Sequence, residues 1–299
     1  MTYLTIFTSP KPFTLNPHIN TIQRNAIQSW LHLSSEVDVF MMGDEAGMAD
    51  VAAEYQVRQF PDVRLNEMNT PLLNSMFQIA REASQSPYLM FTNADILYLP
   101  DILNATRQVA ALTRDFLLLG RRWDLDVTKP LDFSPGWDEL LRSDTIRRGQ
   151  LHAPVGSDYF IYPRHLMTDM PDFAIGRSGW DNWTIYHGRQ AGWAVVDITR
   201  AAMVIHQNHD YSHLPGGLPP YDLEETQRNI RLAGGMKKMY TILETNKILE
   251  AGRLRPAPIT IPKLSHWLEL KLIDSDPRST PNSLVRRLRR TRRKYIVTS

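Results

Sequence analysis

The sequence contains no cysteine. This absence excludes disulfides, thiolate metal sites and cysteine nucleophiles, and it fits a reducing compartment, for which we expect the cytoplasm. Apolar runs of about 18 residues, the length needed to cross a membrane, are also missing. A strand-like run already begins at Tyr3, so we expect no signal peptide. With 299 residues, 42% of them hydrophobic and 22% charged, the chain can still form a full core.

Acidic residues are absent after Asp276, and this absence makes the charge distribution uneven. Seven of the 34 basic residues lie in the run RRLRRTRRK near the end of the chain, which leaves 27 basic against 32 acidic residues elsewhere. The net charge of +2 therefore combines a mildly acidic body with a strongly basic tail, residues 283–299. The tail is either a solvated end or a short amphipathic helix that associates peripherally with the anionic inner face of a membrane. Its apolar residues would be Leu284, Val285 and Leu288.

Nucleic acid is not an expected partner, because the acidic body offers no extended basic surface. Two familiar nucleotide-binding patterns are absent as well. The first strand-like run is followed by FTSPKPF, which has neither the glycines of a dinucleotide-binding turn nor the Gly-Lys-Ser/Thr of a phosphate loop.

Strand-like and helix-like patterns alternate over the first 120 residues. The strand-like runs are residues 3–9, 37–43, 88–96 and 115–123, with a short strand or loop at 57–63. Apolar residues recur at helical spacing in residues 20–33, 48–57, 71–84 and 99–113. Strands separated by helices pair in parallel, with the helices on the sheet faces. We therefore predict an α/β fold, with a Rossmann-like, mostly parallel sheet in residues 1–120.

The remainder of the chain is less regular. Residues 121–220 contain five of the seven tryptophans and only short strand-like pieces. We expect this part to be the irregular acceptor-side half of the same domain, covering a site built on residues 1–120. Residues 221–282 predict a C-terminal extension that is first helical and then proline-rich, followed by the basic tail.

The run YLMFTNADILYLP, residues 88–100, is apolar except for Asn93-Ala94-Asp95. A polar group buried without a partner costs about 2–7 kcal/mol, so Asp95 either lies at the open end of a strand or binds something. Ligands of open α/β sheets bind at the carboxyl ends of the strands, where a carboxylate can ligate a hard divalent cation. The alternative is a cap for the helix near Pro100, but four residues intervene.

Other candidate residues lie in two later segments. In GWDNW, Asp181 lies between two tryptophans, where partial desolvation would suit a general base. Alternatively it marks a helix start that is capped by Ser178. Asp158, in GSDYF, is the competing base. Arg121 and Arg122 end a strand and could clamp a diphosphate, although paired arginines are common on surface edges.

The segment HQNHDYSH, residues 206–213, holds three histidines and Asp210. Such a cluster could bind metal, so a metal-dependent hydrolase is one alternative function, and histidines of an ordinary polar loop are another reading. A hydrolase would need a second cluster of acids, which the sequence does not offer.

The order of six motifs resembles that of bacterial nucleotide-sugar glycosyltransferases of the GT-A fold, close to the family-2-like group. The motifs, in residues 3–215, are FTSPKPF, FMMGDE, FTNADI, GSDYFIYP, GWDNW and VIHQNHDYSH. The resemblance implies transfer of a sugar from a nucleoside-diphosphate sugar to a saccharide or lipid-linked glycan acceptor. It also implies that Thr8, Ser9 and Asp44 contact the nucleoside.

The resemblance further implies a cofactor, Mn²⁺ or Mg²⁺, that holds the donor diphosphate. Asp95 matches the last acid of the family's Asp-X-Asp motif, and His206, or as second choice His209, would complete the metal site. Asn93 stands where the family has the first acid. A catalytically silent nucleotide- or sugar-binding domain is therefore the non-enzymatic alternative.

Overall fold

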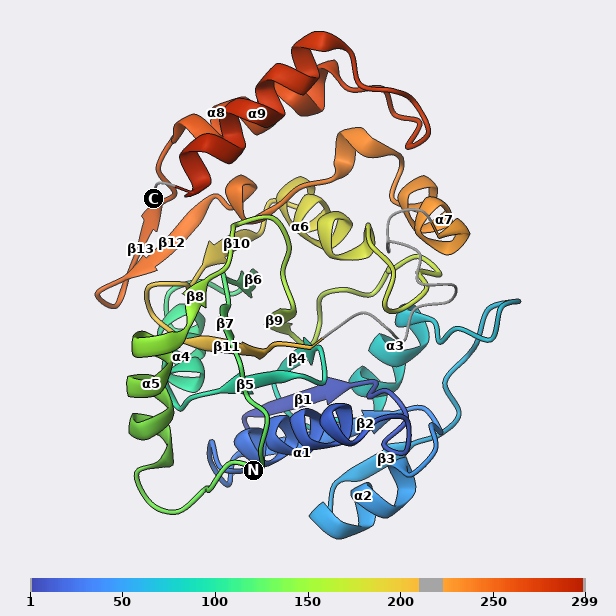
Figure 1. Ribbon diagram of the computed structural model, residues 1–299, viewed down its shortest axis with the longest axis vertical. Coiled ribbons are helices and arrows are strands. Elements are labelled where there is room, and N and C mark those ends of the chain that lie inside the picture. The colour runs from blue at the N-terminus through green and yellow to red at the C-terminus, as the bar shows by residue number, and fades with distance from the viewer. Residues whose placement is uncertain (1, 210–222, 298–299) are drawn as a thin grey trace.

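The computed structural model describes residues 2–209 and 223–297 of the chain. Its main sheet has nine strands in the order β13-β12-β10-β6-β9-β4-β1-β2-β3 (Figure 1). All neighbouring pairs are parallel except those made by β9 and β13. The strands are β1 (Leu4–Thr8), β2 (Val37–Met42), β3 (Arg58–Phe60), β4 (Tyr88–Thr92), β6 (Phe116–Leu119), β9 (Tyr159–Pro163), β10 (Ala194–Asp197), β12 (Lys247–Glu250) and β13 (Arg253–Pro256). The expected α/β fold with a mostly parallel sheet is confirmed.

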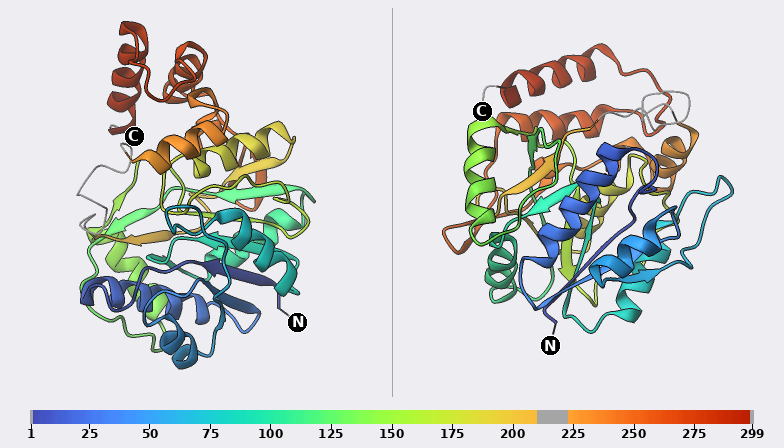
Figure 2. Two further views of the ribbon diagram at one scale, coloured as in Figure 1. Left: turned by 90° about the vertical axis from the view of Figure 1, so that its right-hand side faces the viewer. Right: turned by 60° about the horizontal axis from the view of Figure 1, so that its bottom comes forward.

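Helices cover both faces of this sheet (Figures 1 and 2). One core lies under α1 (Pro17–Leu31), α2 (Met48–Tyr55) and α4 (Asp101–Ala110). The core of the other face lies under α3 (Leu73–Ala83), α6 (Trp180–Gln190) and α7 (Glu224–Leu232). Successive residues of a strand point to opposite faces, so Ile6 of β1 belongs to the first core and Phe7 to the second.

A second, smaller sheet lies beside the carboxyl ends of the main strands, in the order β5-β11-β7-β8. Its strands are β5 (Ile96–Tyr98), β7 (Trp123–Leu125), β8 (Gln150–Leu151) and β11 (Val204–Gln207), and α5 (Trp137–Arg148) packs on it. The prediction of continuous strands at 88–96 and 115–123 is wrong. In both, the chain leaves the main sheet at a polar or glycine position, Asn93 or Gly120, and enters the second sheet.

The second half of the chain does not merely cover the first. β9 is inserted between β4 and β6, and β10 pairs with β6, so both are buried members of the main sheet. Because β9 runs antiparallel, its amino end meets the carboxyl end of β4. This insertion brings the segment before β9 to the same edge as the residues after β4.

The C-terminal part is only partly helical. After α7 come two 3₁₀ turns, η3 (Met236–Lys238) and η4 (Ile242–Glu244), and then the β12–β13 hairpin, which extends the sheet. Two helices, α8 (Ile261–Leu272) and α9 (Ser283–Val297), pack together as the outermost layer at one end of the molecule (Figures 1 and 2). None of the described helices combines the length and the apolar character that a membrane span requires.

Candidate active site

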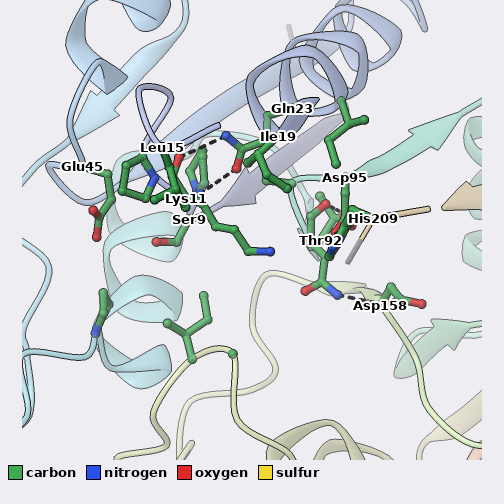
Figure 3. A pocket seen from close by; sticks show the side chains of 18 of the residues that line it. Ser9, Lys11, Leu15, Ile19, Gln23, Glu45, Thr92, Asp95, Asp158 and His209 are labelled. Atoms are coloured by element: carbon green, nitrogen blue, oxygen red, sulfur yellow. Dashed lines mark hydrogen bonds and ion pairs between the residues drawn. The ribbon is translucent and has the colours of Figure 1, made fainter. Parts of the chain in front are cut away.

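A pocket of about 580 Å³ opens where β1 and β4 end (Figure 3). Its described walls include Ser9 after β1, Asn93 and Asp95 after β4, Asp158 before β9, and His206 in β11. A volume of this order suits a small-molecule ligand. The site therefore lies at the carboxyl edge of the parallel strands, as the sequence predicts.

Asn93 and Asp158 are joined because β4 and β9 are paired. Thr92 lies opposite Tyr159 in the ladder. The Asn93 backbone N–H donates to the Asp158 carbonyl at 2.9 Å, and Asn93 Nδ2 donates to Asp158 Oδ1 at 3.0 Å. The side chain at position 93 thus faces a carboxylate, and an amide can donate to it where a second carboxylate could not.

Asp95 ends the turn after β4 and faces two histidines. Its Oδ2 lies 3.0 Å from His209 Nε2 and 3.8 Å from His206 Nε2. Burial opposes ionisation of Asp95, but the hydrogen bond of His209 and the charges of His206, His209 and Lys11 outweigh it and lower the pKa to about 2. The helix-cap alternative is wrong, because α4 begins at Asp101 behind Pro100 and has no side-chain cap.

His206 belongs to β11, which pairs with β5 on one side and with β7 on the other. Its imidazole therefore lies between the carboxylates of Asp95 and Asp124. His206 pairs with Ile96 of β5, the neighbour of Asp95, and with Asp124 of β7. Its Nδ1 lies 3.3 Å from Asp124 Oδ1. Burial lowers the pKa of His206, but the two acids outweigh burial and raise it above its ordinary value.

Asp124, which the sequence did not single out, contacts the site through His206. Burial opposes its ionisation, yet contacts with His206, His152 and Arg122 hold its pKa well below the ordinary value. Its oxygens lie 2.6 Å from His152 Nδ1 and 2.9 Å from Arg122 Nε. No local pattern marks Asp124, because its role depends on the pairing of β7 with β11.

The residues present fit a divalent cation. One ligand atom from each of Asp95, His206 and His209 lies within 4.8 Å of the others. Asp95 Oδ1 is buried and has no hydrogen-bond partner, so it remains available as a ligand. A set of one carboxylate and two imidazoles suits Mn²⁺ better than Mg²⁺, which prefers oxygen. Asp210 and His213, the other members of the predicted cluster, lie outside the described residues.

Cations reach the pocket from two elements. Lys11 extends its side chain into the pocket (Figure 3), and its loop is held to α1 by Gln23, which bonds the Lys11 backbone N–H at 2.7 Å and carbonyl at 3.0 Å. Arg122 also lines the pocket, and its Nη1 lies 2.5 Å from Asp158 Oδ1. Arg121, in contrast, donates from Nε to the His152 carbonyl at 2.6 Å. Lys11 was not singled out from the sequence, although its position in FTSPKPF, directly after the first strand, indicates a place at the edge where the pocket opens.

Asp181 lies in the first turn of α6. The helix begins after Gly179, whose φ of 109° favours glycine, and the expected cap by Ser178 is absent. Burial raises the pKa of Asp181 to about 6, and the charge of Asp158 adds to the effect. The residue does not line the described pocket, but a Cβ placed on Gly156 would lie 3.4 Å from its Oδ2.

Of the three residues predicted to contact the nucleoside, only Ser9 lines the described pocket. Thr8 is buried with no hydrogen-bond partner for its hydroxyl. Asp44 is exposed, 3.4 Å from Gln59 Nε2, and its neighbour Glu45 lines the pocket instead. Contact of Thr8, Ser9 and Asp44 with a nucleoside stays a prediction.

No protein-family model matches the sequence, and no curated protein sequence matches it either. Among solved structures, S. aureus TarS 1-349 in complex with UDP-GlcNAc is similar with a TM-score of 0.50 at 11% identity, over 91% of this chain and 73% of that one. Glucosyl-3-phosphoglycerate synthase from Mycobacterium tuberculosis, in complex with Mg²⁺ and UDP, gives a TM-score of 0.45 at 16% identity, over 78% and 79%. The similarity to TarS, with the sheet described above, identifies the fold as GT-A.

Proposed function

We propose that this protein is a glycosyltransferase that moves a sugar from a nucleoside-diphosphate sugar to a saccharide or lipid-linked glycan. The observation that carries the proposal is the position of Asp95, His206 and His209 in the pocket wall, at the carboxyl edge of a GT-A sheet. The structure of TarS contains UDP-GlcNAc, so UDP-sugars are the first donors to test.

Asp95, His206 and His209 would hold the cation, for which Mn²⁺ is the better candidate and Mg²⁺ the alternative. When bound, such a cation neutralises negative charge on the donor diphosphate. Lys11 supplies a further positive charge inside the pocket and would stabilise the departing nucleoside diphosphate. Ser9 is placed to contact the donor, with Thr8 and Asp44 as further proposed nucleoside contacts.

In the transfer step, the acceptor hydroxyl oxygen forms a bond to the anomeric carbon while the bond from that carbon to the diphosphate breaks. The bonding electrons leave with the nucleoside diphosphate, and the hydroxyl proton passes to a carboxylate. We assign this proton to Asp181, because a pKa of about 6 leaves the group ionised but basic at neutral pH. Asp158 is the competing base, and its Oδ1 already accepts hydrogen bonds from Arg122 and Asn93.

The proposal also covers the class of acceptor and the location of the protein in the cell. Transfer to a growing or lipid-linked glycan, as in polysaccharide biosynthesis, would be helped by peripheral attachment to the inner face of a membrane. The five exposed basic residues of the tail support this location, because basic residues near an anionic surface contribute about 1 kcal/mol each.

The test is a thermal-shift panel of UDP-, GDP- and dTDP-sugars with and without Mn²⁺, followed by mass spectrometry of the products with saccharide acceptors. A true donor raises the melting temperature in proportion to its binding, more strongly with Mn²⁺. In Asp95→Asn, the additional rise in melting temperature that depends on Mn²⁺ should be lost. Asp115→Asn, at the opposite edge of the sheet just before β6, is the matched control.

The two alternatives give different results in the same experiment. A silent binding domain would be stabilised by a nucleotide sugar but would form no product with any acceptor. A metal-dependent hydrolase would be stabilised by Mn²⁺ without a nucleotide preference. Within the described residues, Asp95, His206 and His209 form the single group that could hold a metal ion, which leaves no second cluster for such a hydrolase.

A further inference from the structure

One side of α8 carries a stripe of exposed apolar side chains. Its members are between 41% and 49% exposed and recur every three or four residues, which places them on one side of the helix. They are Ile261, Leu264, Trp267, Leu268 and Leu272. Large apolar patches of this kind on a folded surface mark sites of interaction with another body.

The opposite side of α8 is buried and mostly polar, since its buried residues are Ser265, His266, Glu269 and Leu270. His266 Nδ1 lies 2.9 Å from Glu244 Oε1. Glu269 accepts from Arg289 Nε of α9 at 2.7 Å and also pairs with Arg292. These buried contacts hold α8 in one rotation about its axis, so the apolar stripe cannot turn inward.

The neighbouring helix α9 buries only part of its apolar residues, since Leu284 is 49% exposed. Val285 is fully buried, and the Leu288 carbonyl accepts a hydrogen bond from Ser265 of α8 at 2.8 Å. The expectation that Leu284, Val285 and Leu288 together form a membrane-binding face is therefore wrong, because Val285 is not available. The tail is also not a merely solvated end, since α9 is docked on α8.

The outward side of α9 carries exposed cations. They are Arg286, Arg287, Arg290, Arg293 and Lys294. The two helices lie side by side as the outermost layer at one end of the molecule (Figure 2).

We infer that the apolar stripe of α8, together with the cations of α9, docks this protein on an anionic membrane. Leucine and isoleucine side chains would enter the interface between headgroups and acyl chains, and the arginines would contact anionic headgroups. Trp267 is suited to such an interface, where tryptophan is enriched, and Lys271 Nζ already lies 4.4 Å from the centre of its ring. Charge complementarity favours a lipid surface over a second copy of this chain, because two copies would bring their cations together.

The inference deepens the membrane attachment proposed above by naming the surface that docks, and it is tested separately from sugar transfer, since docking needs neither donor nor acceptor. It is tested with the full chain and vesicles of phosphatidylcholine with or without phosphatidylglycerol, without any nucleotide. The wild type should co-sediment with the anionic vesicles only, and added salt should weaken the binding. Replacing two exposed leucines, Leu264→Gln with Leu268→Gln, should reduce partitioning at least about tenfold.

A matched control replaces two even more exposed apolar residues of α5, Leu140→Gln with Ile146→Gln, which are 73% and 64% exposed, and should bind as the wild type does. A second variant, Arg287→Gln with Arg290→Gln, should lose preference for anionic vesicles. Trp267 is the most exposed of the tryptophans, so its fluorescence should shift to the blue with vesicles, and Trp267→Phe should remove that shift.

Unchanged binding by the double leucine variant would overturn the inference and assign attachment to α9 alone. Failure of the wild type to bind anionic vesicles would overturn it as well. If the leucine variant instead converts an oligomer into a monomer in light scattering, with no vesicle binding by either form, the stripe is an interface between copies of this chain.

Discussion

Nε2 of His209 lies 3.0 Å from Oδ2 of Asp95, although 114 positions separate the two residues in the chain. The antiparallel pairing of β5 with β11 produces this contact, because each residue lies just beyond one of the two paired strands. Asp95 directly precedes β5, and His209 follows two residues after the end of β11. The proposed metal site therefore depends on the smaller sheet as much as on the main one.

Asp181→Asn should lower kcat by about 10²–10⁴-fold and leave donor affinity nearly unchanged, because the base acts on the acceptor in the transition state. In the wild type, kcat should fall as the pH drops through about 6, where Asp181 becomes protonated. Steady-state kinetics over a pH series checks both. Near-normal turnover of the variant would transfer the role to Asp158.

The same substitution should stabilise the fold at high pH. The pKa of Asp181 is raised from 3.8 to about 6, so ionisation of this carboxyl group destabilises the folded state. The destabilisation is complete at pH values above about 6 and absent at pH values below 3.8. Asp181→Asn removes this destabilisation. The free energy of unfolding should rise by up to about 3 kcal/mol at pH 8 and be unchanged near pH 4.

Denaturation in urea at the two pH values measures that difference. A variant stabilised equally at both would show that the carboxyl group is not desolvated in the folded protein.

Asn93→Asp should destabilise the protein, although it restores the first acid of the Asp-X-Asp motif. The new carboxylate would face Asp158 Oδ1, which now receives a hydrogen bond from Asn93 Nδ2 at 3.0 Å. We expect a loss of about 1–3 kcal/mol at pH 8. Asn93→Ala, which loses the hydrogen bond without adding charge, is the control and should lose less. Equal or higher stability of the aspartate variant would show that the two side chains can separate.

Glu269→Gln should loosen α9 from α8, because it removes the charge that holds Arg289 and Arg292. A loss of about 1–3 kcal/mol is expected locally, since hydrogen bonds to charged groups are worth that much. Hydrogen exchange should become faster in α9 and remain unchanged in the main sheet. Glu250→Gln, which breaks an exposed pair with Arg200, should have little effect. Unchanged exchange in α9 would mean that apolar contacts alone hold it.

Local patterns predicted the parts of the fold that depend on local sequence. The apolar run before Asn93 identified β4, and the polar interruption placed Asp95 at the edge where ligands bind. The insertion of β9 could not be read in this way, because its position between β4 and β6 depends on residues far apart in the chain. Asp124 was missed for the same reason, since only its pairing with His206 brings it into contact with the site.

The C-terminal helices show another limit of sequence patterns. The spacing of Leu264, Leu268 and Leu272 indicates a helix with an apolar side, but such a pattern normally predicts burial of that side. Here, the buried Glu269 and His266 decide the rotation, and their partners lie in α9 and η4. Which side of an amphipathic helix faces the core thus depends on charges elsewhere in the chain.

The most direct test of the central claim is calorimetric titration of UDP into the protein with and without Mn²⁺. The account predicts that Mn²⁺ tightens UDP binding at least about tenfold in the wild type and in Asp115→Asn. In Asp95→Asn, binding should be the same with and without the metal, while the melting temperature stays near that of the wild type. Metal-dependent UDP binding that survives in Asp95→Asn, or its absence from the wild type, would contradict the account.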